Sequence, residues 1–114
     1  MPMSEIAYTV SCTFADAAVA ERWLAWLKDK HLADVLAGGA THATVVQYTE
    51  QLEDPQAAVH LEVRYRFASR EAFEVYEREH APALRAEGLE RFPLSLGLTY
   101  SRRVGEIVAE ESRA

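Results

Sequence analysis

The fold of this chain can be worked out from the stretch WLAWLKDKHLADVLAGG, residues 23–39, because its pattern returns once later in the sequence. Its second half, HLADVLAGG from His31, aligns without a gap with HAPALRAEG, which starts at His80. At 100° per residue, the apolar positions of each copy fall in one narrow stripe that includes the histidine. Each copy is therefore predicted to be an amphipathic helix that faces a core and is followed by a glycine.

Segments with strand-like alternation flank both predicted helices. The alternation of apolar and polar side chains predicts strands over residues 6–14, 41–50, 59–67 and 94–103. The first helix is predicted to begin after Asp16, whose carboxylate can accept hydrogen bonds from first-turn amides, and to end near Ala37 at two glycines in left-handed geometry. The second is predicted to begin after Ser69 and to end at about Phe92, with a kink or restart at Pro82.

The order strand, helix, strand, strand, helix, strand predicts an α+β protein with the ferredoxin-like βαββαβ arrangement. A four-stranded antiparallel sheet then carries both helices on one face. The segment QLEDPQAA, residues 51–58, is predicted to be a loop between two strands. We assign residues 1–104 to this single domain and residues 105–114 to an acidic C-terminal tail that frays.

Composition limits the class of protein. A chain of 114 residues that is 49% hydrophobic can bury one core. Its net charge of -6, together with predicted open strands that lack aromatics for stacking bases, argues against nucleic acid and membranes as partners. Cys12 is the one cysteine, and the N-terminal residues lack the layout of a signal peptide. We therefore expect a cytoplasmic protein.

The sheet face opposite the predicted helices carries polar residues at its centre. Thr9 and Ser11 are expected to lie there beside Glu62 and Arg64. On an open face these residues would simply be solvated, whereas charges on a covered face need a partner or a polar ligand. We expect a homodimer of the dimeric α/β barrel type that covers this face. Arg64, Glu62, Thr9, Ser11 and Trp23 are then the candidate contacts of a small polar or anionic metabolite.

His31 and His80 are the candidate catalytic residues, because an imidazole near neutral pH can act as a general base. The structural alternative is that each lies in the last turns of its helix, where it hydrogen-bonds a carbonyl and meets the negative end of the helix dipole. Since the helices are expected to run antiparallel, the two histidines would lie on the order of 20 Å apart. We therefore expect no shared metal ion, and we predict no cofactor.

The other aromatic and sulfur-containing residues are interpreted mainly as structural. Trp23 and Trp26 are three residues apart, and Leu24 and Leu27 fill the same stripe, so one tryptophan is predicted to be in the core and the other at a helix edge or a subunit interface. The alternative is that both only flank the core. Cys12 alternates with core residues and is predicted to be an inert buried thiol.

The two helix blocks, WLAWLKDKHLADVLAGG and YEREHAPALRAEGLERF, closely resemble an uncharacterised bacterial family, the domain-of-unknown-function family 4286. The resemblance extends from Tyr8 to about Val104. This family is similar to the dimeric α/β barrel proteins, which include cofactor-independent monooxygenases, isomerases, dehalogenating enzymes and haem-degrading enzymes. The resemblance implies the fold, and a fold does not fix a function.

Three classes of function stay open on the sequence. The one we favour is a homodimeric module that binds a small molecule without transforming it. The second is a cofactor-independent monooxygenase or isomerase with His31 or His80 as the proton acceptor, and the third is a protein that only associates with itself or another chain. The sequence has no recognisable nucleophile–base pair, glycine-rich phosphate loop or metal-ligand cluster, so it leaves open whether the protein is an enzyme.

Overall fold

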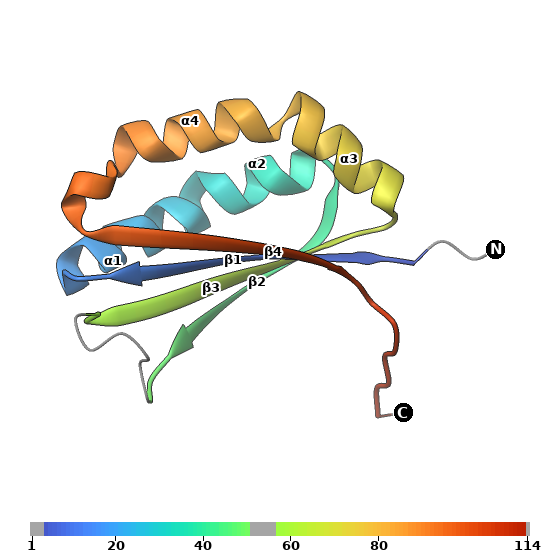
Figure 1. The fold of residues 1–114 in the computed structure, drawn as a ribbon, viewed down its shortest axis with the longest axis horizontal. Helices are drawn as coiled ribbons and strands as arrows, with labels where there is room; N and C mark the ends of the chain where they lie inside the picture. The colour runs from blue at the N-terminus through green and yellow to red at the C-terminus, as the bar shows by residue number, and fades with distance from the viewer. Residues whose placement is uncertain (1–3, 51–56, 114) are drawn as a thin grey trace.

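The computed structural model describes residues 4–50 and 57–113 as a sheet with helices on one face (Figure 1). The strands are β1 (Ile6–Phe14), β2 (Ala40–Tyr48), β3 (Val59–Phe67) and β4 (Leu98–Glu106), and they lie antiparallel in the order β2-β3-β1-β4. The helical segments are α1 (Ala17–Trp26), the π-helix η1 (Leu27–His31), α2 (Leu32–Ala37), α3 (Arg70–Glu79), α4 (Ala81–Arg91) and the 3-10 turn η2 (Leu94–Leu96). The predicted ferredoxin-like α+β arrangement is confirmed. Residues 51–56 of the predicted loop lie outside the described residues.

The local signals that start and interrupt the helices act as predicted. Asp16 accepts a 2.8 Å hydrogen bond from a first-turn amide of α1, and Ser69 accepts one of 3.1 Å from a first-turn amide of α3. The second helix breaks at His80, where φ is -120°, and restarts as α4 with Pro82 in its first turn. Side-chain capping and proline geometry therefore account for these boundaries.

The glycines that aligned in the sequence have different roles. Of Gly38 and Gly39, only Gly39 has a positive φ, 128°, so it alone gives the left-handed termination predicted for these two residues. An added Cβ at Gly38 would lie 3.1 Å from Cγ of His80, which shows that this position is small because the two helices approach closely. Gly88 lies inside α4, not after it, and a Cβ there would be 3.4 Å from Cη2 of Trp26. The prediction that a glycine follows the second helix is therefore wrong.

The last strand begins later and ends later than predicted. Residues 94–96 form η2, which ends at Gly97 with a left-handed φ of 89°, so β4 begins at Leu98 and continues through Glu106. Leu94 and Leu96, which were predicted to face the core, are consequently exposed. Beyond β4, the Ile107 amide donates a 2.9 Å hydrogen bond to the Glu5 carbonyl, so the start of the tail that we expected to fray is attached to the domain.

The core lies between the sheet and the helices. Both tryptophans of α1 are buried, with Trp23 exposed by 3% and Trp26 by 9%, so the prediction that only one enters the core is wrong. The reason is that α1 packs against the end of α4 as well as the sheet: the Trp26 ring lies 5.6 Å from that of Phe92, the residue that follows α4, and the Trp23 ring lies 5.3 Å from that of Phe14. Cys12 is fully buried, and burial raises the pKa of its thiol to about 12, which fits an inert thiol. No helix in the described part of the chain has the length and apolar character needed to cross a membrane.

Candidate functional site

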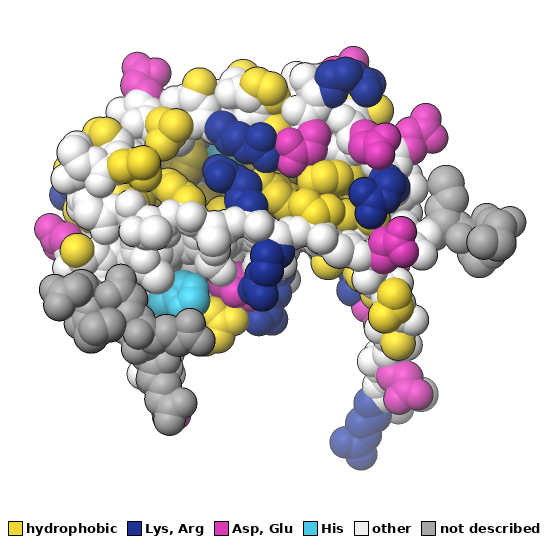
Figure 2. All heavy atoms as spheres, viewed as in Figure 1, with side chains coloured by type: hydrophobic (Ala, Val, Ile, Leu, Met, Phe, Trp, Pro, Cys, Tyr) yellow, Lys and Arg dark blue, Asp and Glu magenta, His cyan; other side chains and the backbone are white. Residues whose placement is uncertain are grey.

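A pocket of about 510 Å³ lies between the sheet and the helices. Figure 2 shows it as a hollow with hydrophobic walls between α4 and β4. Aromatic rings dominate these walls, contributed by Tyr8, Trp23, Trp26, Tyr65, Tyr76 and Tyr100. A concave, mainly apolar cavity with a few polar groups is typical of sites for small molecules.

A hydrogen bond joins two of the rings that line the pocket, those of Trp23 and Tyr100. Trp23 comes from α1, and its Nε1 donates a 3.1 Å hydrogen bond to the hydroxyl of Tyr100 on β4. The two rings lie 6.3 Å apart and are tilted by 54°. Burial raises the pKa of Tyr100 to about 12, so its hydroxyl stays neutral at physiological pH. Trp23, a predicted ligand contact, therefore lies on the wall of this pocket.

His31 closes the π-helix η1 and also lines the pocket. Its ring stacks on that of Trp26 at 4.4 Å, and its buried Nδ1 has no hydrogen-bond partner within residues 4–50 and 57–113. Burial lowers the pKa of His31, so the neutral imidazole predominates at pH 7. Short π-helices within α-helices are frequent at functional sites. A neutral imidazole on a cavity wall can accept a proton or a hydrogen bond.

His80 does not share this environment, although it aligned with His31. It lies at the break between α3 and α4, is exposed, and has its ring 6.5 Å from that of Tyr76. His31 is followed by only the six residues of α2, so it lies within the last two turns of the first helix as predicted, whereas His80 lies where α3 ends and α4 begins. An added Cβ at Gly38, the residue after α2, would lie 3.1 Å from Cγ of His80, so the two histidines do not lie at opposite ends of the domain. Pro82 interrupts only the second helix, which explains why the two copies differ.

Two arginines that the sequence analysis did not single out line the same pocket. Arg85 of α4 donates from Nη2 to the Tyr8 hydroxyl at 3.2 Å and to the Glu77 carboxylate at 2.8 and 3.0 Å. Desolvation lowers the pKa of Arg85, but these hydrogen bonds outweigh it and raise the pKa. The guanidinium of Arg102 on β4 lies 5.6 Å from the centre of the Tyr100 ring. Strand alternation was the sequence pattern that could have identified Arg102, because it puts Arg102 on the same face of the sheet as Tyr100.

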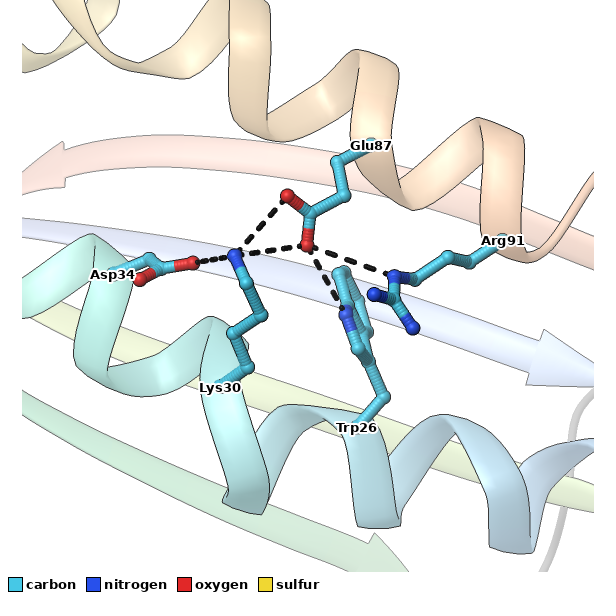
Figure 3. Close-up of polar contacts among 5 residues, drawn as sticks. All are labelled: Trp26, Lys30, Asp34, Glu87 and Arg91. Atoms are coloured by element: carbon cyan, nitrogen blue, oxygen red, sulfur yellow. Dashed lines mark hydrogen bonds and ion pairs between the residues drawn. The ribbon is translucent and has the colours of Figure 1, made fainter.

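A polar cluster joins η1 to α4 beside the pocket (Figure 3). The ammonium of Lys30 lies 2.5 Å from Asp34 and 3.1 Å from Glu87. Glu87 also accepts a 3.4 Å hydrogen bond from Nε1 of Trp26 and lies 3.7 Å from Nε of Arg91. Such exposed pairs contribute little to stability, because water screens them. Their main effect is to fix the edge of the Trp26 ring that forms the pocket wall.

The open sheet face carries the polar residues predicted for it. The β1–β3 register places Thr9 opposite Arg64 and Ser11 opposite Glu62. Glu62 is 5% exposed and accepts hydrogen bonds from Ser11 Oγ at 3.0 Å, Tyr48 Oη at 3.1 Å and Arg64 Nε at 2.8 Å. Desolvation raises the pKa of Glu62, but these donors lower it overall, so the carboxylate is ionised at pH 7.

The structure separates the predicted ligand contacts into two places. Thr9, Ser11, Glu62 and Arg64 share the open face, while Trp23 lies across the sheet in the pocket. The open face also carries the half-buried ring of Tyr48, which lies 4.7 Å from that of His60 and is tilted by 31°. Within the described residues, no group of three or more His, Cys, Asp or Glu side chains is arranged to hold a metal ion.

The fold and the pocket define a class: a two-layer ferredoxin-like α+β domain with an aromatic cavity between its layers. The chain belongs to the family DUF4286, a domain of unknown function, whose model matches residues 5–100. This confirms the resemblance carried by the two helix blocks. A comparison with curated proteins finds no match.

Several solved structures share the fold at low sequence identity. A dimeric ferredoxin-like protein from an uncultured marine organism has a TM-score of 0.69 and 11% identity over 95% of this chain and 99% of its own. An EthD-like protein from Ralstonia eutropha has a TM-score of 0.67 and 16% identity over 96% and 97%. A monooxygenase from Streptomyces coelicolor, in complex with nanaomycin D, has a TM-score of 0.67 and 12% identity over 100% and 96%. These likenesses establish the fold.

Proposed function

We propose that the protein is a homodimeric module that binds a small aromatic molecule in the pocket between the sheet and the helices. The observation that carries the proposal is the cavity of about 510 Å³ with ring-lined walls. Pockets for small ligands usually measure about 300–1,000 Å³ and combine apolar walls with a few polar groups. The proposed ligand site is on the helix side of the sheet, whereas Arg64 and Glu62 lie on the open face. Contact of these two residues with a polar metabolite stays a prediction.

A titration with the neutral probe N-phenyl-1-naphthylamine tests this proposal. The chain has two tryptophans, Trp23 and Trp26, and both line the pocket. Excitation of the tryptophans should therefore transfer energy to a probe bound beside them. We expect saturable binding of one probe per chain, with a dissociation constant in the micromolar range, and quenched tryptophan emission. Probe fluorescence that rises without saturation and leaves the tryptophan emission unchanged would contradict the proposal.

The second copy in this proposal covers the open sheet face. Glu62, Arg64 and Tyr48 form a polar network at its centre, which suits a partly desolvated contact between two sheets. The fold is shared with a protein described as dimeric, which supports the same arrangement. A cytoplasmic location, consistent with the unpaired thiol of Cys12, completes the proposal.

Light scattering and native mass spectrometry at several protein concentrations measure this assembly. We expect a mass twice the 12.8 kDa of one chain, and any retained ligand appears as additional mass. Thr9→Arg places a third guanidinium on β1, between Arg64 of β3 and Arg103 of β4, so repulsion across the interface should produce monomers. Ala86→Arg makes the same change on an exposed position of α4 and should leave the dimer intact. A wild-type monomer at every concentration would overturn the dimer.

One observation favours a cofactor-independent monooxygenase or isomerase as a second candidate. Nδ1 of His31 is buried at the pocket wall without a hydrogen-bond partner among the described residues, and burial lowers the pKa of its imidazole. A base that is neutral at pH 7 and faces a bound molecule can remove a proton from it. His80, exposed at the helix break, is a weaker candidate for this role.

His31→Gln separates this candidate from simple binding. The ligand that co-purifies with the wild-type protein is released, returned to it in air in D2O, and followed by mass spectrometry. Oxygenation adds oxygen, while an isomerisation that passes through solvent exchange adds deuterium. We expect His31→Gln to slow either conversion by roughly 10²–10⁴-fold and to keep probe binding within a few fold. An unaltered ligand, or equal conversion by the variant, would argue against His31 as a base.

A further inference from the structure

We infer that the ligand of the pocket is an aromatic anion, oriented with its acidic group at Arg102 on the mouth and its uncharged aromatic body inside. This inference rests on the proposed function, because it assigns a chemical class and an orientation to the molecule bound in that pocket. It follows from where the charges and the neutral polar groups of the pocket lie.

The charged groups that line the pocket are all cationic. Arg85 and Arg102 are part of its wall, and no Asp or Glu among the described residues is. Histidine contributes no positive charge at neutral pH, because burial lowers the pKa of His31. A cavity with apolar walls and cationic groups attracts anions more strongly than the same charges would in water. The net charge of the whole chain, -6, makes this local positive charge a feature of the pocket rather than of the protein.

The two arginines differ in how much of their charge is already matched. Arg85 contacts both carboxylate oxygens of Glu77 and the hydroxyl of Tyr8. Arg102 has no carboxylate within salt-bridge distance in the described parts of the chain; its guanidinium lies over the ring of Tyr100. It is exposed and comes from β4, the edge strand along the opening, and Figure 2 shows Lys and Arg side chains beside the hollow between α4 and β4. Arg102 is therefore the group placed to bind an incoming acid.

The interior of the pocket suits an uncharged body. Burial raises the pKa of Tyr76 to about 12 and also raises the pKa of Tyr65, so both phenols stay neutral. Both side chains are nearly fully buried, with Tyr65 exposed by 4% and Tyr76 by 3%. Neutral rings stack well on aromatic molecules, whereas an ionised group placed among them would lose its hydration without gaining a counter-charge. The acidic group is thus directed to the mouth.

Two related probes test the inference. 8-Anilino-1-naphthalenesulfonate has the aromatic body of N-phenyl-1-naphthylamine and one added sulfonate, so their affinity ratio measures the preference for an anion. At low ionic strength we expect the wild-type protein to bind the sulfonate at least fivefold more tightly than the neutral probe. Arg102→Gln should remove this preference and leave the affinity for the neutral probe unchanged, and Arg102→Lys should restore part of it.

Arg103→Gln is the matched control, because it makes the same change one residue away on the opposite face of the sheet. It should leave both affinities unchanged. An equal affinity of the wild-type protein for the two probes would overturn the inference, as would an equal loss of sulfonate affinity in the Arg102→Gln and Arg103→Gln variants. In either case, saturable binding of the neutral probe would still support the proposed function. Failure of both probes to bind would overturn the two together.

Discussion

The double variant Val10→Phe/Leu84→Trp is expected to bind N-phenyl-1-naphthylamine about a hundredfold more weakly than the wild-type protein. Val10 comes from the sheet and Leu84 from α4, and both are half-buried residues on the pocket wall. Larger rings at these positions extend into the open space rather than into the closed core. A probe that loses about 100 Å² of apolar contact forfeits about 2.5 kcal/mol of binding free energy, which is close to a hundredfold.

Leu36→Trp provides the control for this variant. Leu36 is 40% exposed on α2 and is not part of the pocket wall. The Leu36→Trp variant therefore adds an indole outside the pocket. We expect wild-type affinity for the probe, measured as enhancement of probe fluorescence. Urea unfolding of the double variant establishes that it is folded. A folded double variant with wild-type affinity would show that the probe binds outside this pocket.

Phe67→Ala is expected to lower the free energy of unfolding by about 3–5 kcal/mol. Phe67 is fully buried on β3, and its ring lies 5.2 Å from that of Phe73 and 5.1 Å from that of Tyr76. Removing it takes away buried apolar surface and leaves a cavity that the rigid sheet cannot close. Urea unfolding followed by circular dichroism measures the loss.

Val108→Ala serves as the comparison for Phe67→Ala. Val108 is 88% exposed beyond β4, so its truncation should change the free energy of unfolding by less than about 0.5 kcal/mol. Because Phe67 does not line the pocket, the folded Phe67→Ala protein should lose much less probe affinity than the double pocket variant. Similar unfolding free energies for Phe67→Ala and the wild-type protein would contradict the assignment of this ring to the core.

The candidate site could be predicted only in part from the sequence. The amphipathic stripe placed His31 toward the interior, and His31 lines the pocket. Trp23, a candidate ligand contact from the sequence, lines it as well, although the pattern did not settle which tryptophan faces inward. The same stripe cannot distinguish a residue that fills a core from one that borders a cavity, since both are apolar and face inward. Arg85 and Arg102 were not identified because their importance comes from a pocket formed by α4 and β4 together with other elements. Strand alternation alone indicates the face of the sheet on which Arg102 lies, but not the residues that surround it.

Local pattern was sufficient for the order of elements, the N-caps and the break in the second helix. Each depends on residues a few positions apart. Other features depend on contacts between distant residues. Gly88 faces the ring of Trp26, which comes from α1, far away in the sequence. His31 and His80 have different surroundings because the His31 ring stacks on Trp26 at the pocket wall and His80 lies at a helix break. Sequence periodicity indicates which face of a helix or strand a residue occupies. The packing of separate elements determines which residues it contacts on that face.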